Sequence, residues 1–241
     1  MRETLPKALK LMFGHEGGYV NATTDRGGPT KYGITHATLA AYRGVKSVTA
    51  AQVKALTLTE AESIYRQRYW IQSGGDVLPV GLDYAAFDFG VNSGPARAVK
   101  TLQQVVKVAA DGKIGPKTLA AVRAYPGGTV HLIRDYCAAR MLFLRSLTSP
   151  ATGFPVNGRG WTIRVTGVDP KGQWASTPGV VGHAVQMAME ATPGKPAPKP
   201  PVDPGAFGAG VKAALPAPPV GIGAVVAVVI ALAFLAVIFG G

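Results

Sequence analysis

The chain has a single cysteine among its 241 residues, which excludes an intramolecular disulfide. Cys137 lies in the apolar stretch DYCAARMLFL, which predicts a small buried residue rather than a reactive thiol. Histidine is also scarce, and none of the four histidines forms an HxxxH or HxH pair. This pattern disfavours a zinc amidase or peptidase, and we expect neither a metal ion nor an organic cofactor.

Acidic residues are few: 13 carboxylates face 25 lysines and arginines, for a net charge of +12. A basic protein suits an anionic polymer or surface, such as a cell wall, a membrane or a nucleic acid. No nucleic-acid-binding motif accompanies the charge, so we expect no nucleic-acid partner. The first residues, MRETLPKALKLMF, lack the apolar core and cleavage site of a secretory signal, so none is expected.

Charge is absent from the last part of the chain, where residues 220–239 form an unbroken apolar run. A helix of that length spans the roughly 30 Å core of a bilayer. We therefore predict a transmembrane helix at 220–239, which would anchor the protein in a bacterial inner membrane. Residues 192–219 contain nine prolines and predict an extended linker in front of this anchor.

Convincing strand alternation is missing from the first 190 residues, whereas helical periodicity and capping signals recur. The fold class is therefore mainly α, with a possible small β-hairpin within 19–34. The N-terminal half is expected to hold a helix on the apolar face Leu5–Phe13, a helix capped by Thr35, one capped by Thr49, and one opened by a Thr59–Glu62 capping box and running through Trp70. Further helices are expected at 82–92, 95–108, 116–125, 129–147, 158–167 and 180–190.

Glu16 closes the first helical segment, where the helix dipole disfavours negative charge. That position raises the pKa of a carboxyl group, as an acid catalyst working near neutral pH requires. Asp25 follows on a glycine-rich turn and Thr30 comes shortly after it. Two carboxyl groups and a hydroxyl suit glycoside hydrolysis, in which one acid protonates the leaving oxygen and the other stabilises positive charge or activates water.

The stretch HEGGYVNATTDRGGPTKYGIT resembles the signature of glycoside hydrolase family 108, the N-acetylmuramidases of phage endolysins and related bacterial proteins. The resemblance continues through TLTEAESIYRQRYW, DYAAFDFGVNSGPARAVKTLQQ, ADGKIGPKTLAAV and GRGWTIRV. It implies a lysozyme-like helical fold with Glu16 as the catalytic acid. Phage-type lysozymes use Glu, Asp and Thr in this order, so Asp25 and Thr30 become catalytic candidates, with Thr30 orienting the attacking water.

Other residues carry both a functional and a structural interpretation. Tyr19 and Tyr32 flank the motif and could stack on sugar rings or pack in the core, and Asn92 could line the glycan site from a short polar turn. Asp25 could also be only a turn-former. We assign Trp161 and Arg164 to packing and the surface, and place Arg123, Arg134, Arg140 and Arg145 on solvated helix faces.

The predicted organisation is a catalytic segment at 1–83, a peptidoglycan-binding helical segment at 84–191, the linker at 192–219 and the anchor at 220–239. The function expected from this resemblance is an endolysin that cuts the β-1,4 bond between N-acetylmuramic acid and N-acetylglucosamine, with peptidoglycan, the membrane and a holin-like protein as partners. A lytic transglycosylase and a non-catalytic cell-wall-binding membrane anchor remain alternatives. Lysines before the tail favour a cytoplasmic enzyme domain, whereas the substrate lies outside, so either placement is open.

Overall fold

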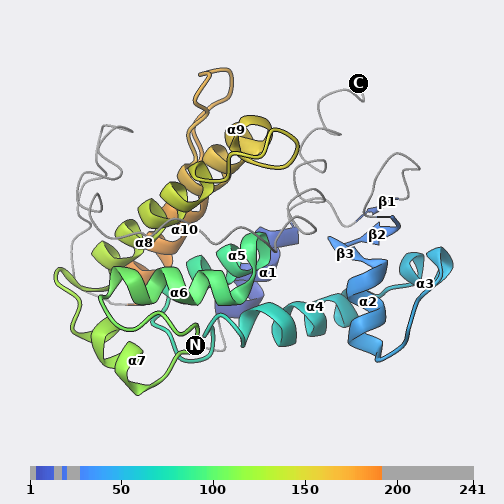
Figure 1. Ribbon diagram of the computed structural model, residues 1–241, viewed down its shortest axis with the longest axis horizontal. Coiled ribbons are helices and arrows are strands. Elements are labelled where there is room, and N and C mark those ends of the chain that lie inside the picture. The colour runs from blue at the N-terminus through green and yellow to red at the C-terminus, as the bar shows by residue number, and fades with distance from the viewer. Residues whose placement is uncertain (1–3, 14–17, 21–27, 192–241) are drawn as a thin grey trace.

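The computed structural model describes residues 4–13, 18–20 and 28–191, and within these ranges the chain is mainly helical with one small sheet (Figure 1). The mainly α prediction is thereby confirmed. The strands are β1 (Tyr19–Val20), β2 (Thr30–Lys31) and β3 (Ile34–Thr35). The helices are α1 (Thr4–Phe13), α2 (His36–Arg43), α3 (Ala50–Lys54), α4 (Leu58–Tyr65), the π-helical segment η1 (Arg66–Trp70), α5 (Leu82–Ser93), α6 (Pro95–Val105), α7 (Pro116–Arg123), α8 (Gly128–Arg145), α9 (Phe154–Thr166) and α10 (Gly179–Glu190).

The small sheet is antiparallel, in the order β1-β2-β3, so the expected hairpin is present and has a third strand. Thr30 in the central strand pairs with Val20 on one side and Thr35 on the other. Tyr32 and Gly33 join β2 to β3 with positive φ angles of 52° and 71°. Positive φ at both positions is typical of the two-residue type I′ turn, whose twist matches that of the flanking strands.

Threonine side chains cap three helices in the N-terminal half. Thr35 and Thr49 accept hydrogen bonds from the first turns of α2 and α3, as predicted. The predicted cap at Thr59 is wrong, because α4 is capped by Thr57, whose hydroxyl accepts from the backbone N–H of Glu60 at 3.2 Å. The sequence TLTEAE contains the Thr-x-x-Glu pattern twice, and only Thr57 has the extended backbone that a cap requires.

Two other helix boundaries differ from the prediction by about one turn. Helix α6 ends at Val105, because Lys107 adopts a left-handed φ of 58°. Helix α9 begins at Phe154 rather than 158, with Pro155 in its first turn, where the missing backbone N–H costs no hydrogen bond.

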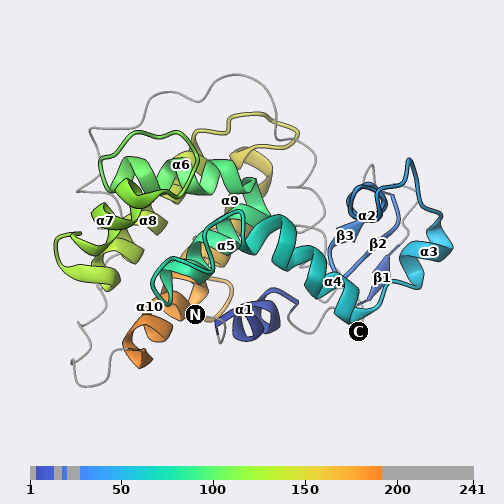
Figure 2. The same ribbon diagram turned by 90° about the horizontal axis from the view of Figure 1, so that it is seen from below.

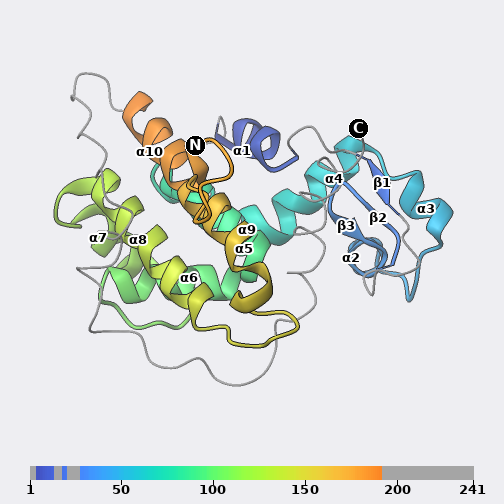
Figure 3. The ribbon, with the colours of Figure 1, turned by 90° about the horizontal axis from the view of Figure 1, so that it is seen from above.

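Helix α5 lies at the centre of the helical part and contacts α1, η1, α6, α8 and α10. Its side chains from Leu82 to Asn92 are buried on every face, as expected for a helix that is apolar all round. Figures 2 and 3 show α4 running from this helical part to the sheet, α2 and α3, at the opposite end of the molecule from α7.

No helix in residues 4–13, 18–20 and 28–191 is long and apolar enough to cross a bilayer. The predicted linker at 192–219 and the predicted anchor at 220–239 both lie outside the described residues.

Candidate active site

The two predicted catalytic carboxylates, Glu16 and Asp25, lie outside the described residues, so the site is defined by the residues around them. Phe13 ends α1 three positions before Glu16. Its ring makes edge contacts with the rings of Tyr32, at 6.0 Å between centroids, and Tyr65, at 5.2 Å. The end of α1 therefore packs against the β2–β3 turn and against α4.

Thr30 lies in the central strand of the sheet and is 7 % exposed. Its hydroxyl donates a hydrogen bond to the backbone carbonyl of Gly28 at 3.1 Å. This bond uses the hydroxyl's hydrogen and leaves its oxygen able to accept a hydrogen bond. The side chain is thus held in one orientation, as a group that positions water must be.

The two tyrosines predicted to bind substrate lie in or next to the same sheet. Tyr19 in β1 is paired with Lys31 in β2, and both tyrosines are half-buried against the core. Tyr32 also accepts a hydrogen bond at its backbone oxygen from the Tyr65 hydroxyl, at 3.0 Å. All three residues thus lie in or next to one small sheet, but the register, with Tyr19 opposite Lys31 and Thr30 opposite Val20, directs the Tyr19 and Thr30 side chains to opposite faces.

Asn92 is placed differently from the prediction. It lies in the last turn of α5 rather than in a polar turn, and it is buried. Its side-chain oxygen accepts a hydrogen bond from the Ser93 hydroxyl at 2.9 Å. This bond satisfies the side-chain oxygen of Asn92, and the predicted contact of Asn92 with glycan stays a prediction.

A buried ion cluster in the helical part was not predicted. Asp88 in α5 accepts hydrogen bonds from Arg140 in α8 at 2.7 Å and from Arg164 in α9 at 2.6 Å. Arg140 is only 1 % exposed, and its guanidinium lies 5.0 Å from the centre of the Phe89 ring. The Nη2 atom of Arg164 also approaches the Met12 sulfur at 3.2 Å, which connects the cluster to the last turn of α1.

The surface assignment of Arg140 and Arg164 is therefore wrong. Burial by itself raises the pKa of Asp88, but the charges and hydrogen bonds of the two arginines outweigh it and hold the pKa below its usual range. The sequence did contain a signal for this cluster. Because LDYAAFDFGVNS is apolar on all sides, a carboxylate inside it needs cationic partners brought from elsewhere.

A second buried carboxyl group, that of Asp83, has a raised pKa, in contrast to Asp88. Asp83, in the first turn of α5, accepts hydrogen bonds through Oδ1 from the backbone N–H groups of Gly81 and Tyr84. Burial raises the pKa of Asp83 to about 6. Cys137 is buried as predicted, and burial raises the pKa of its thiol to about 12, so it is not a reactive thiolate.

An open pocket of about 390 Å³ lies between α6, α7 and α8, lined in part by Lys107, Tyr125, His131 and Asp135. The Tyr125 hydroxyl donates to Asp135 at 2.7 Å, and burial together with this bond raises the pKa of Tyr125 to about 12. In the parts of the chain that the structure describes, no three His, Cys, Asp or Glu side chains are grouped so as to hold a metal ion.

Two family models match consecutive parts of the chain. Residues 9–94 match the Glycosyl hydrolase 108 family model, and residues 97–166 match a model described as a predicted peptidoglycan domain. The solved structure of SagA from Brucella abortus is 45 % identical over 78 % of this chain and 97 % of that one, with a TM-score of 0.65. No curated protein matches the chain. The chain therefore belongs to the glycosyl hydrolase 108 family and is a glycoside hydrolase that acts on peptidoglycan.

Proposed function

We propose that the enzyme is a lysozyme-type N-acetylmuramidase, an endolysin that hydrolyses the β-1,4 bond between N-acetylmuramic acid and N-acetylglucosamine. The observation that carries the proposal is the position of the described residues on either side of Glu16. The Phe13 ring packs on Tyr32 where α1 meets the β2–β3 turn, Thr30 lies in the central strand that leads into this turn, and Tyr19 lies in the neighbouring strand opposite Lys31. A helix end, a buried hydroxyl and a tyrosine ring thus lie in or next to one small sheet.

In the proposed reaction, the protonated carboxyl group of Glu16 donates its hydrogen to the glycosidic oxygen as the bond from that oxygen to the muramic acid C1 breaks. The Asp25 carboxylate stabilises the positive charge that develops on C1, or removes a proton from the attacking water. The water oxygen bonds to C1 and keeps one proton as the new C1 hydroxyl, while its other proton is lost to Asp25 or solvent and re-protonates Glu16 for the next cycle. Thr30 accepts a hydrogen bond from that water through its free lone pair, and the tyrosine rings support the sugar faces.

Zymography on purified peptidoglycan tests the assignment of Glu16. Glu16→Gln keeps the size of the side chain and removes the transferable proton, so we expect the clearing band to disappear. Glu190→Gln is the matched control, because Glu190 is exposed at the end of α10 and pairs with Lys7 on the surface. Clearing by Glu16→Gln at the wild-type level contradicts the assignment of Glu16 as the acid, whereas the absence of clearing by both the wild type and the variant favours the non-catalytic wall anchor.

Mass spectrometry of the digested polymer separates hydrolysis from the transglycosylase alternative. A lytic transglycosylase lets the sugar's own hydroxyl attack C1 and therefore produces 1,6-anhydro ends. A muramidase uses water and leaves reducing ends. We expect reducing N-acetylmuramic acid ends, because Asp25 and Thr30 provide a way to hold a water molecule that a transglycosylase does not need.

Residues 220–239 support a further part of the proposal, namely that the enzyme is anchored to a bacterial inner membrane through this apolar segment. Lys195, Lys199 and Lys212 precede the segment and no charge follows it, which favours a cytoplasmic enzyme domain. In that arrangement the enzyme reaches the wall once a holin-like partner opens the membrane. Protease treatment of intact spheroplasts tests this: the body is expected to be protected, and digestion from outside contradicts the inside-first topology.

A further inference from the structure

The segment between α9 and α10, residues 168–178, leaves the helical part as a projecting loop (Figure 1). It starts just after the residues that match the peptidoglycan domain, which end at 166. Gly167 ends α9 with a φ of 78°, and its backbone carbonyl accepts a hydrogen bond from the N–H of Thr177 at 2.8 Å. This hydrogen bond holds the two ends of the loop together, and the residues between them project from its base.

One carboxylate fixes the shape of this loop from inside. Asp169 is buried, with a side chain only 1 % exposed, and it accepts hydrogen bonds from the backbone N–H groups of Lys171, Gln173 and Trp174 at 2.9 to 3.2 Å. Arg159 in α9 donates two more, at 2.9 and 2.8 Å. The hydrogen bond from Arg159 holds the pKa of Asp169 well below its usual range, so the carboxylate that accepts these bonds is ionised near neutral pH.

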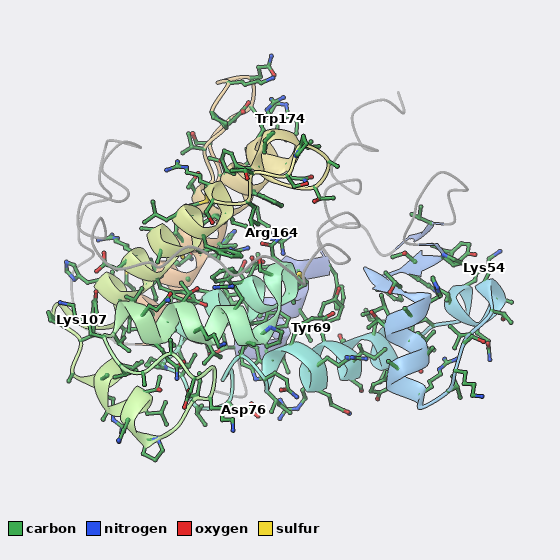
Figure 4. All side chains as sticks on the ribbon, in the orientation of Figure 1. Lys54, Tyr69, Asp76, Lys107, Arg164 and Trp174 are labelled. Atoms are coloured by element: carbon green, nitrogen blue, oxygen red, sulfur yellow. The ribbon has the colours of Figure 1, made fainter. Side chains whose placement is uncertain are left out.

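The loop presents a tryptophan to water. All three tryptophans of the chain lie in the described ranges, and Trp70 and Trp161 are buried, whereas Trp174 is 39 % exposed. The Arg159 guanidinium lies 5.0 Å from the centre of the Trp174 ring and supports one face of it. Figure 4 shows Trp174 further out than Arg164, on the side where the loop projects. A large aromatic side chain held in place on the surface indicates a binding contact rather than core packing.

We propose that Trp174 and the 168–178 loop form an accessory binding site for a sugar ring of the N-acetylated β-1,4 glycan strand, separate from the sheet that carries Thr30. The inference rests on the proposed function in that it takes peptidoglycan glycan as the ligand. The flat indole surface matches the apolar C–H face of a pyranose ring. Lys171 and Gln173 are exposed next to it in sequence and supply a cation for carboxylates of the attached peptide stems and an amide for the N-acetyl groups of the strand.

A site of this kind keeps the enzyme on an insoluble polymer between successive cuts. The Asp169 hydrogen bonds order the loop before the ligand arrives, so binding does not have to immobilise the indole. A basic protein on an anionic wall is already concentrated near its substrate, and the aromatic contact adds a preference for sugar over other anionic surfaces.

Binding to peptidoglycan is measured on the full chain in detergent, in a Glu16→Gln background so that the polymer is not cut. We expect Trp174→Ala to weaken sedimentation with insoluble peptidoglycan about tenfold and Trp174→Phe to retain most of the binding. Val156→Ala is the matched control, because Val156 is 59 % exposed on α9 and contributes no aromatic surface. Circular dichroism and the melting temperature establish that each variant is folded.

Fluorescence gives a second measurement on the same protein. Because the other tryptophans are buried, acrylamide quenching reports mainly on Trp174, and soluble β-1,4 N-acetylglucosamine oligomers are expected to protect it. Asp169→Asn is expected to loosen the loop and to weaken binding as Trp174→Ala does. Equal binding by Trp174→Ala and Val156→Ala overturns the proposal, as does protection of Trp174 by anionic lipid vesicles and not by sugar, which would make the loop a membrane contact.

These binding measurements fail independently of the proposed reaction. If Glu16 is not the acid, the zymogram shows it while Trp174 still binds glycan. If Trp174 binds no glycan, the binding proposal is wrong, but the wild-type enzyme still cleaves soluble fragments and the proposed reaction stands.

Discussion

The sheet-bearing part of the molecule, residues 18–57, and the helical part, α5 to α10, are stabilised in different ways. In the sheet-bearing part the contacts that define each element are local: threonines cap α2 and α3, and a two-residue turn joins β2 to β3. In the helical part Asp88 is paired with Arg140, 52 positions away, and with Arg164, 76 positions away. The ends of the elements in the first region depend on neighbouring residues, although the Tyr65–Tyr32 bond reaches across 33 positions, whereas the second region is joined by buried charges from distant segments.

The buried ion cluster joins the two segments that the family models match into one structural unit. Asp88 lies within the glycosyl hydrolase match at 9–94, whereas Arg140 and Arg164 lie within the peptidoglycan-domain match at 97–166. The same cluster contacts Met12 at the end of the helix that precedes Glu16. The second segment therefore packs directly against α1, the helix that precedes the predicted acid Glu16.

The largest effect is expected from Asp88→Asn, which leaves two buried guanidinium groups without a carboxylate. Removing one partner of a buried ion pair costs about 3–5 kcal/mol of unfolding free energy. Glu60→Gln is the matched control, since the Glu60–Arg43 pair is part-exposed, at 24 % and 30 %, and is expected to lose about 1 kcal/mol or less. Urea unfolding measures both, and equal losses would remove the contrast between the two regions.

The next effect concerns the pH dependence of stability. With a pKa of about 6 in the folded state against 3.8 for the ordinary group, folded Asp83 holds a proton that the unfolded chain releases. The contribution of Asp83 to the free energy of unfolding is therefore fully present below about pH 4 and is lost as the pH rises through about 6. The total loss is roughly 3 kcal/mol, at about 1.36 kcal/mol per pKa unit.

Asp83→Asn removes the titration while it keeps the oxygen that accepts from Gly81 and Tyr84. We expect the variant to gain stability relative to wild type between pH 4 and pH 7, measured by urea unfolding at several pH values. A constant difference across this range would show that the carboxyl group is ionised throughout.

A smaller and more local effect is expected at Gly33 in the β2–β3 turn. A Cβ at this position would lie 2.7 Å from the Tyr65 hydroxyl, in addition to the cost of a left-handed φ of 71°. We expect Gly33→Ala to lower stability by about 2 kcal/mol, of which 1–2 kcal/mol is the backbone term, and to reduce activity, because Tyr65 holds the Tyr32 backbone beside Phe13.

Gly44→Ala is the matched control, because Gly44 has a φ of 69° but open space where the Cβ would lie. Gly44→Ala is expected to lower stability only by the cost of the left-handed φ, and to leave zymogram activity unchanged. If both variants lose activity equally, the contact with Tyr65 does not position the turn.

The same contrast explains which parts of the structure the sequence could predict. The caps at Thr35 and Thr49 and the proline starts of α6 and α7 depend on residues a few positions apart, so they were predictable. Arg140 and Arg164 were misassigned because nothing near them in sequence shows that α8 and α9 bring them to one carboxylate. For the candidate site, the motif indicates Glu16, Asp25 and Thr30, while the contact of Met12 with Arg164 arises from packing across 152 positions.

The smallest effect concerns the two threonines in TLTEAE. Thr57→Ala removes the hydroxyl that accepts from the Glu60 N–H and is expected to cost about 1 kcal/mol. Thr59→Ala changes an exposed side chain inside the first turn of α4, and the expected loss is below about 0.5 kcal/mol. Both residues are threonines with a glutamate three positions later, so composition and spacing are matched, and only the backbone conformation differs. Thermal unfolding of the two variants therefore measures the stability that the Thr-x-x-Glu pattern contributes when its threonine is the N-cap. A larger loss for Thr59→Ala would show that Thr59, and not Thr57, caps α4.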